Sequence, residues 1–184
     1  MYRLCLLLIV TCFACHTPQQ NNAVSEKTDI EKIDFDQKLK ELNITLPTMK
    51  TPIANFKHVV QADKTLYLAG KGPKDANGNY IKGKLGEDMT VEGGYAAARA
   101  SGIQQLAVLK EHLGDLNKVK QVLKVQGMVN ATSTFENHPE VINGFSDLMV
   151  EVFGERGKHA RAAVGMSSLP RNIAVEVDMI VEVY

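Results

Sequence analysis

Cysteine is nearly absent from this chain, and the few cysteines are confined to one end. All three lie within the first 15 of the 184 residues, at Cys5, Cys12 and Cys15. If the chain is cleaved in this segment, the mature domain has no thiol. Such a domain can form no internal disulfide, use no cysteine nucleophile and bind no metal through thiolates.

The chain also lacks an excess of charge of either sign. Lys and Arg total 21 residues, as do Asp and Glu, so the formal net charge is zero. No dense run of Lys and Arg with interleaved aromatic residues occurs, although such a stripe is typical of nucleic-acid-binding surfaces. We therefore expect no nucleic-acid partner.

Several motifs that mark enzymes are missing as well. The glycine-rich stretch over residues 70–86 contains no Gly-x-x-x-x-Gly-Lys-Ser/Thr run, so it is interpreted as a surface loop rather than a phosphate loop. The histidines are too scattered to form a metal set, and Ser167 and Ser168 lie in no nucleophile-elbow context. Neither a metal nor a cofactor is expected.

The first residues predict a targeting signal rather than part of the folded domain. An apolar run over residues 4–14 is too short to span a bilayer and has the length of a signal-peptide core. A small residue and then Cys15 follow, which resembles a bacterial lipobox, although Cys12 stands where leucine is usual. We expect residues 1–14 to be a signal peptide and Cys15 to be lipidated, with the protein exported to the periplasm or cell envelope. Cleaved secretion without a lipid and an uncleaved anchor are the alternatives.

Residues 15–47 are expected to hold the domain away from a membrane surface. The first part is rich in Gln, Asn, Ser and charge, which is typical of a tether. Residues 29–42 carry apolar side chains at helical spacing and predict a short amphipathic helix capped by Thr28 or Asp29. The folded domain is then expected over residues 48–184.

Periodicity predicts one α+β domain, and a hydrophobic content of 45% is enough for a packed core. The expected elements, in order, are strands over 56–61 and 65–69, a helix capped by Thr90 and Gly114, a strand over 119–129, a helix over 139–153, and strands over 160–166 and 173–184. Strict alternation in the last strand places Glu176 on its polar face. In the strand over 119–129 it places Leu123 with Val125, and Val122 on the other face. This order predicts a mixed sheet with two helices on one face, and with the strand of Arg161 beside the last strand.

Arg161 is a single cation among small residues. Such a cation needs a carboxylate partner, either from the protein or from a ligand. An ion pair with Glu176 or Asp178 across the sheet is the structural interpretation, and a ligand carboxylate is the functional one. For Glu176 the structural alternative is a solvated strand face.

Three segments near the C-terminus carry a resemblance: Ala160-Arg161-Ala162-Ala163-Val164, Leu169-Pro170 and Val175-Glu176-Val177. Together they are similar to the C-terminal signature of the RidA/YjgF (L-PSP) reactive-intermediate deaminase family. The stretches 68–73 and 141–144 support the resemblance, which covers about residues 48–184. Within the family the chain looks like the YjgF/chorismate-mutase-like branch, often labelled putative endoribonuclease.

The resemblance implies a chorismate-mutase-like trimer with sites in clefts between subunits. It implies that Arg161 binds a substrate carboxylate and that Glu176 positions a hydrolytic water. Asn143 and Gly70 would line the cleft, Asn143 otherwise being a helix cap or turn residue. The implied chemistry is hydrolysis of enamine or imine acids to 2-keto acids and ammonia, without cofactor or metal. A non-catalytic module that binds a small carboxylate, and an endoribonuclease, are the alternatives.

Three positions depart from the family pattern. Phe56 stands at the position of a substrate-contacting tyrosine, so the hydroxyl is lost. Ala163 replaces a common cysteine, and His159 stands where proline or alanine is usual. His159 is either a loop residue or a group that changes the charge of the pocket near neutral pH.

Overall fold

The computed structural model describes residues 32–184, so the predicted signal peptide, Cys15 and most of the tether lie outside the described residues. The described α-helices and strands are α1 (Phe35–Glu41), β1 (Val59–Ala62), β2 (Thr65–Lys71), α2 (Val91–Leu113), β3 (Val119–Asn130), α3 (His138–Phe153), β4 (Ala160–Met166) and β5 (Val175–Val183). Short 3-10 turns cover Leu116–Lys118, Gly154–Gly157 and Pro170–Asn172. None of the helices in this part of the chain combines the length and apolar character needed to cross a bilayer.

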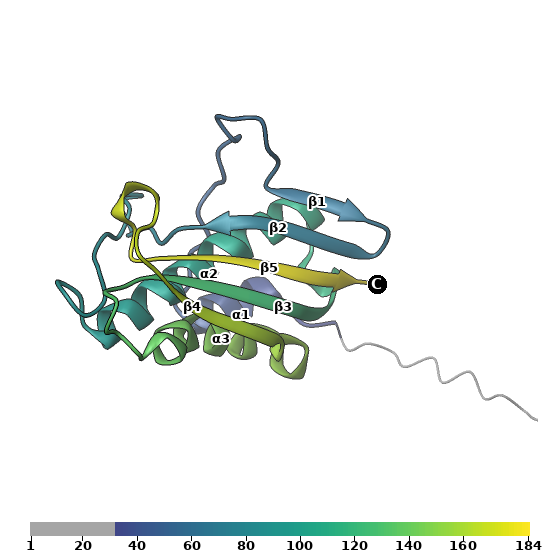
Figure 1. Cartoon of the computed structure of the whole chain (residues 1–184). Helices are drawn as coiled ribbons and strands as arrows, with labels where there is room; N and C mark the ends of the chain where they lie inside the picture. Colours follow the sequence, from purple (N-terminus) through teal and green to yellow (C-terminus); the bar gives the residue numbers. More distant parts are fainter. Residues whose placement is uncertain (1–31) are drawn as a thin grey trace, which may run out of the picture. The chain divides into compact units, whose positions relative to one another are not determined.

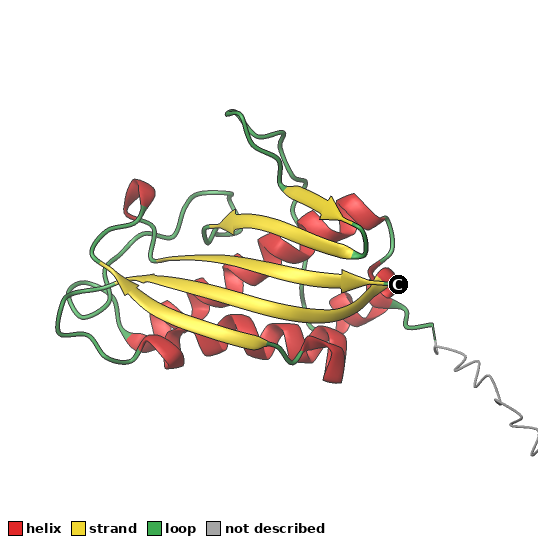
Figure 2. Ribbon diagram, turned by 45° about the vertical axis from the view of Figure 1, so that its right-hand side comes forward, coloured by secondary structure: helices red, strands yellow, loops and turns green. Residues whose placement is uncertain are grey.

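The strands form one mixed sheet in the order β1-β2-β5-β3-β4. Only the β3–β4 pair is parallel, because α3 carries the chain back between those two strands. α2 and α3 cover one face of the sheet, as Figures 1 and 2 show, which confirms the predicted α+β fold with two helices on one face. The predicted neighbour of β4 was wrong: β5 returns between β2 and β3, so β3 separates β4 from β5.

Local signals for the ends of α2 and of the hairpin are confirmed. The Thr90 side chain accepts a hydrogen bond from the Gly93 N–H at the start of α2, and Gly114 ends the helix with φ of 74°. Asp63 turns the β1–β2 hairpin with φ of 53°. The predicted start of the first helix was too early, because Asp34 caps α1.

Alternation holds in β5 but fails in part of β3. Every second residue of β5 from Val175 is buried, as predicted. In β3, Val122 is fully buried and Leu123 is 38% exposed, the reverse of the prediction. The register against β5 shifts between Val122 and Lys124, and this irregularity resets the side-chain alternation.

Two glycines let α3 lie close to its neighbours. A Cβ at Gly144 would lie 2.0 Å from the carbonyl oxygen of Tyr95 in α2, and a Cβ at Gly127 would lie 2.5 Å from the Ile142 side chain. Both contacts exclude a side chain at the glycine. The close packing fixes α3 beside the edge of the sheet that carries β4.

Candidate functional site

Arg161 lies on the edge strand β4 and points toward α3. It is in register with Val125, which is buried beneath the helices. Arg161 Nη1 donates hydrogen bonds to Asn143 Oδ1 at 2.8 Å and to Ser146 Oγ at 3.1 Å. None of the ion pairs found within residues 32–184 includes Arg161, so the ion pair across the sheet is not formed. The guanidinium is therefore held by neutral oxygens.

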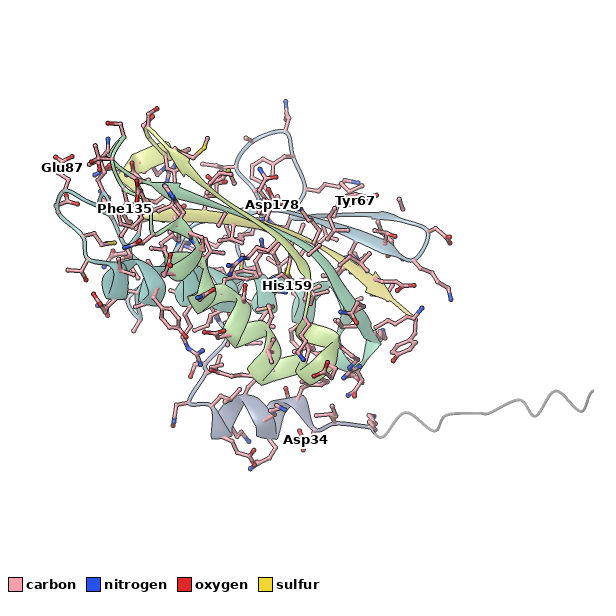
Figure 3. The ribbon with its side chains drawn as sticks, turned by 60° about the horizontal axis from the view of Figure 1, so that its bottom comes forward. Asp34, Tyr67, Glu87, Phe135, His159 and Asp178 are labelled. Atoms are coloured by element: carbon pink, nitrogen blue, oxygen red, sulfur yellow. The ribbon has the colours of Figure 1, made fainter. Side chains whose placement is uncertain are left out.

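A hollow of about 250 Å³ adjoins this guanidinium, lined by Ser146, Val150, Lys158, His159 and Arg161. His159 lies between α3 and β4 (Figure 3), and its two ring nitrogens contact Gly157 O at 2.7 Å and Ser146 Oγ at 3.0 Å. Because a carbonyl oxygen only accepts, Nδ1 carries the proton and Nε2 accepts from the Ser146 hydroxyl. Burial lowers the pKa of His159, and the positive charge of Arg161 lowers it further. The hydrogen bond to Gly157 raises the pKa and opposes part of this effect. A neutral His159 thus orients Ser146 toward Arg161.

Glu176 lies on the opposite face of the sheet. It alternates with buried residues of β5 and is in register with Met128, on the face that α2 and α3 leave uncovered. Asp178 shares this face (Figure 3). A Cβ at Gly70 would lie 2.3 Å from Glu176 Oε1, so the carboxyl group rests directly against the Gly70 backbone. Burial raises the pKa of Glu176.

Lys71 is a residue of this region that we did not predict. Its segment, residues 68–73, supported the family resemblance, but the lysine had no role. The side chain is buried, and Nζ donates to Ala69 O and Gly70 O, each at 3.3 Å. A lysine at the end of an apolar, glycine-containing strand was the only signal in the sequence.

Phe56 precedes β1 and is 52% exposed. Its ring lies edge-on to His58, with 6.2 Å between the ring centroids. His58 O accepts a hydrogen bond from Ala69 N, so the segment that carries Phe56 runs beside the strand that ends near Gly70. Phe56 therefore belongs with the Gly70 region of the sheet, far in strand order from Arg161.

The predicted site residues thus form two separate groups within one chain. Arg161 and Asn143 meet at the β4–α3 edge, while Gly70 and Glu176 meet on the open face of the sheet. The two groups lie on opposite faces of the sheet. No group of three or more metal-ligating side chains was found within the described part of the chain.

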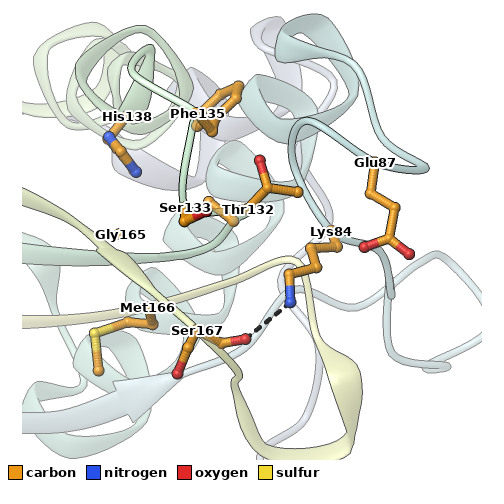
Figure 4. A pocket seen from close by; sticks show the side chains of 10 residues that line it. Lys84, Glu87, Thr132, Ser133, Phe135, His138, Gly165, Met166 and Ser167 are labelled. Atoms are coloured by element: carbon orange, nitrogen blue, oxygen red, sulfur yellow. Dashed lines mark hydrogen bonds between the residues drawn. The ribbon is translucent and has the colours of Figure 1, made fainter.

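A wider hollow, of about 630 Å³, lies where β3 and β4 end (Figure 4). It is lined by Lys84, Glu87, Ala131, Thr132, Ser133, Phe135, His138, Gly165, Met166 and Ser167. Lys84 Nζ donates to Ser167 O at 2.9 Å and ties two of its walls together. None of the predicted site residues lines this hollow.

The mixed five-stranded sheet with two helices on one face makes this an α+β protein, and comparison with known proteins assigns it to the chorismate mutase-like fold. The model of the YjgF/chorismate mutase-like, putative endoribonuclease family matches residues 36–183. Protein TCP17 of Trypanosoma cruzi is 43% identical over 145 residues, which are 78% of this chain and 91% of that protein. The chain therefore belongs to this family.

Two solved structures are similar over most of the chain. A protein of unknown function from Agrobacterium tumefaciens is 40% identical, with a TM-score of 0.75 over 82% of this chain and 94% of that chain. A putative endoribonuclease from Shewanella oneidensis is 30% identical, with a TM-score of 0.77 over 81% and 99% of the two chains. Both likenesses cover nearly the whole described domain.

Proposed function

We propose that this protein hydrolyses reactive enamine or imine acids to 2-keto acids and ammonia, in clefts between the copies of a homotrimer. The observation that carries the proposal is the state of Arg161: a guanidinium held by two neutral oxygens beside a hollow. A guanidinium has five N–H donors, and the two bonds described use only Nη1. The remaining donors can bind a carboxylate in the bidentate geometry that arginine favours.

The opposite placement of Arg161 and Glu176 supports a site shared between copies. In one chain Arg161 points toward α3 and Glu176 toward the uncovered face. A cleft that contains both residues therefore takes Arg161 from one copy and Glu176 from another. A closed ring of three copies would repeat such a cleft three times.

In the proposed reaction Arg161 binds the carboxylate and fixes the direction of the C=N carbon. The imine reacts in its protonated form: the Glu176 carboxylate accepts a proton from water while the water oxygen attacks that carbon, which gives a carbinolamine. Glu176 then returns this proton to the nitrogen. As the C=O bond forms and the C–N bond breaks, the hydroxyl proton passes to Glu176 and ammonia leaves. An enamine acid enters this sequence as its imine tautomer.

The test is the loss of an enzymatically generated imine, such as iminopyruvate, measured by competition with trapping by semicarbazide. We expect the wild type to accelerate the loss and Arg161→Ala to abolish the acceleration. Arg99→Ala is the matched control, because Arg99 pairs with Glu151 between α2 and α3. Decay at the buffer rate with the wild-type protein would contradict the proposal.

A non-catalytic module for small carboxylates is the second candidate. It is favoured by the missing hydroxyl at Phe56 and the missing thiol at Ala163, because both changes remove polar groups from the family pattern. Calorimetry with 2-keto acids distinguishes it from the hydrolase. Binding that depends on Arg161, without turnover, would support the module. Cleavage of RNA without metal is the result that would support an endoribonuclease instead.

We propose further that the protein is exported and anchored by a lipid on Cys15. Support comes from the sequence alone: an apolar run over residues 4–14 directly precedes Cys15 and a polar stretch. Labelling of cells with a radioactive fatty acid tests this proposal. We expect label in the wild type and none in Cys15→Ser, whereas equal labelling of both would contradict it.

A further inference from the structure

Lys71 is an unusual residue because it is buried without an acidic partner in contact. Only 8% of the residue is exposed. Lysine is almost never buried to this degree unless it is paired, since transfer of an ammonium from water is costly. Within residues 32–184 no carboxylate lies within ion-pair distance of Lys71 Nζ, and its hydrogen bonds go to Ala69 O and Gly70 O.

The backbone around Lys71 explains how the ammonium is held. The register of β2 against β5 shifts between Leu68 and Lys71: Ala69 and Gly70 lie opposite a single residue of β5, so β2 has one extra residue here and forms a bulge. Gln105 of α2 donates to Ala69 O at 3.1 Å and to Val177 O at 2.8 Å, which fixes the bulge to β5 and to the helix layer. The ammonium is thus attached to a rigid segment.

The same bulge carries the Glu176 carboxyl group. Lys71 Nζ binds the carbonyl oxygen of Gly70, and Glu176 Oε1 lies against the Cα of Gly70. Cation and carboxylate therefore contact one glycine from different sides. Gly70 permits this approach because it has no Cβ.

We propose that Lys71 is a positioning residue for Glu176: its ammonium, held by the Ala69–Gly70 bulge, keeps the Glu176 carboxylate ionised and turned toward Gly70. The consequence for catalysis depends on the function proposed above. Lys71 itself does not touch the substrate, because its side chain is buried and bound to backbone carbonyls.

Burial and two neighbouring charges act on the pKa of Glu176, and burial and two neighbouring charges act on the pKa of Lys71. Burial raises the pKa of Glu176, Lys71 opposes this, and Asp178 on the same strand adds to it. Burial lowers the pKa of Lys71, Glu176 raises it, and Lys74 lowers it. From α2 the neutral Gln105 contacts the bulge. Removal of the ammonium leaves Glu176 with burial and Asp178 alone, both of which favour its protonated form.

The experiment is an NMR titration of the ¹³C-labelled Glu176 carboxyl group, assigned with Glu176→Gln. In Lys71→Met we expect the pKa of Glu176 to rise by about one pH unit, as loss of a neighbouring opposite charge predicts. Lys71→Arg, which keeps a charge, should return it toward the wild-type value. Lys74→Met is the matched control. It removes a charged neighbour of Lys71 and not of Glu176, so we expect a smaller change in the pKa of Glu176 than in Lys71→Met. An unchanged Glu176 pKa in folded Lys71→Met would overturn the proposal.

A second measurement covers the case in which Lys71→Met does not fold. Coupling between two titrating groups is reciprocal, so Glu176→Gln must lower the pKa of Lys71, followed through its ¹⁵Nζ resonance. An unchanged Lys71 pKa would overturn the proposal equally. If imine hydrolysis occurs, the acid limb of kcat/KM in Lys71→Met should move to higher pH with the Glu176 pKa. Coupled pKa values without any turnover would uphold the role of Lys71 and reject the proposed hydrolase.

Discussion

Arg161 and Glu176 lie on opposite faces of one sheet, and their surroundings differ in charge. Arg161 stands at an edge strand with neutral hydrogen-bond partners, Asn143 and Ser146, and a hollow beside it. Glu176 is half-buried against a glycine bulge, with a buried lysine attached to the same bulge. In the proposed function, the Arg161 half of the site offers its charge to a ligand, whereas the Glu176 half adjusts the proton affinity of its own carboxyl group.

The largest effect on imine hydrolysis is expected from removing Arg161 or Glu176 and then combining the two variants in one assembly. Arg161→Ala and Glu176→Gln should each lose about 100-fold or more of imine hydrolysis, since each removes one half of every cleft. When the two variants are co-expressed, about a quarter of the clefts should regain both wild-type residues by random assembly. The measurement is the imine-loss rate of the purified mixture.

One outcome of this mixing experiment would contradict the assignment of Arg161 and Glu176 to different copies. Mixed samples that stay as inactive as the single variants would show that both residues serve the same copy or that no shared cleft exists. Sedimentation of the same samples reports whether three copies assemble. A double variant of one chain, Arg161→Ala with Glu176→Gln, is the control that should never recover activity on mixing with itself.

A smaller effect is expected at the glycine that separates Lys71 from Glu176. Gly70→Ala places a Cβ 2.3 Å from Glu176 Oε1, so the carboxyl group must move off the bulge. Because the displaced group is the end of a flexible side chain, we expect a loss of about 1–3 kcal/mol in the free energy of unfolding and reduced hydrolysis. Urea denaturation measures the first. The same substitution in a Glu176→Ala background is the control, because the side chain that the added methyl group meets is absent there.

Local structure could be predicted from the sequence where it is determined by residues close together in the chain. The caps of α2 at Thr90 and Gly114 and the alternation of β5 depend on residues next to each other in the chain, and they are confirmed. The position of β5 between β2 and β3 depends on long-range pairing, which a periodic pattern does not encode. The same holds for the irregularity that buries Val122.

For the site, residue identity was easier to predict than surroundings. The motif around Arg161 marked the arginine, but Ser146 as its second partner became visible only when α3 was placed beside β4. Lys71 was overlooked because its burial depends on a bulge against β5. Both omissions concern contacts between segments that are far apart in the sequence.

The smallest effect is expected from pH acting on the Arg161 half through His159. Burial lowers the pKa of this histidine in the folded state, so the unfolded chain binds the proton more tightly. The contribution of neutral His159 to stability is therefore complete above the unfolded pKa of about 6.5. It is lost as the pH falls from there toward the lower folded pKa, below which the two states bind equal protons.

The measurement is urea unfolding of the wild type and His159→Gln at pH 7.5 and pH 5. The wild type should lose more stability on acidification than the variant, which lacks this titration. The difference between the two proteins isolates His159, because Glu176 and Asp178, whose pKa values burial raises, act in the opposite direction in both. Equal losses in wild type and variant would mean that the ring is not held neutral between Gly157 and Ser146. The Arg161 half would then lack the oriented serine that distinguishes it from the Glu176 half.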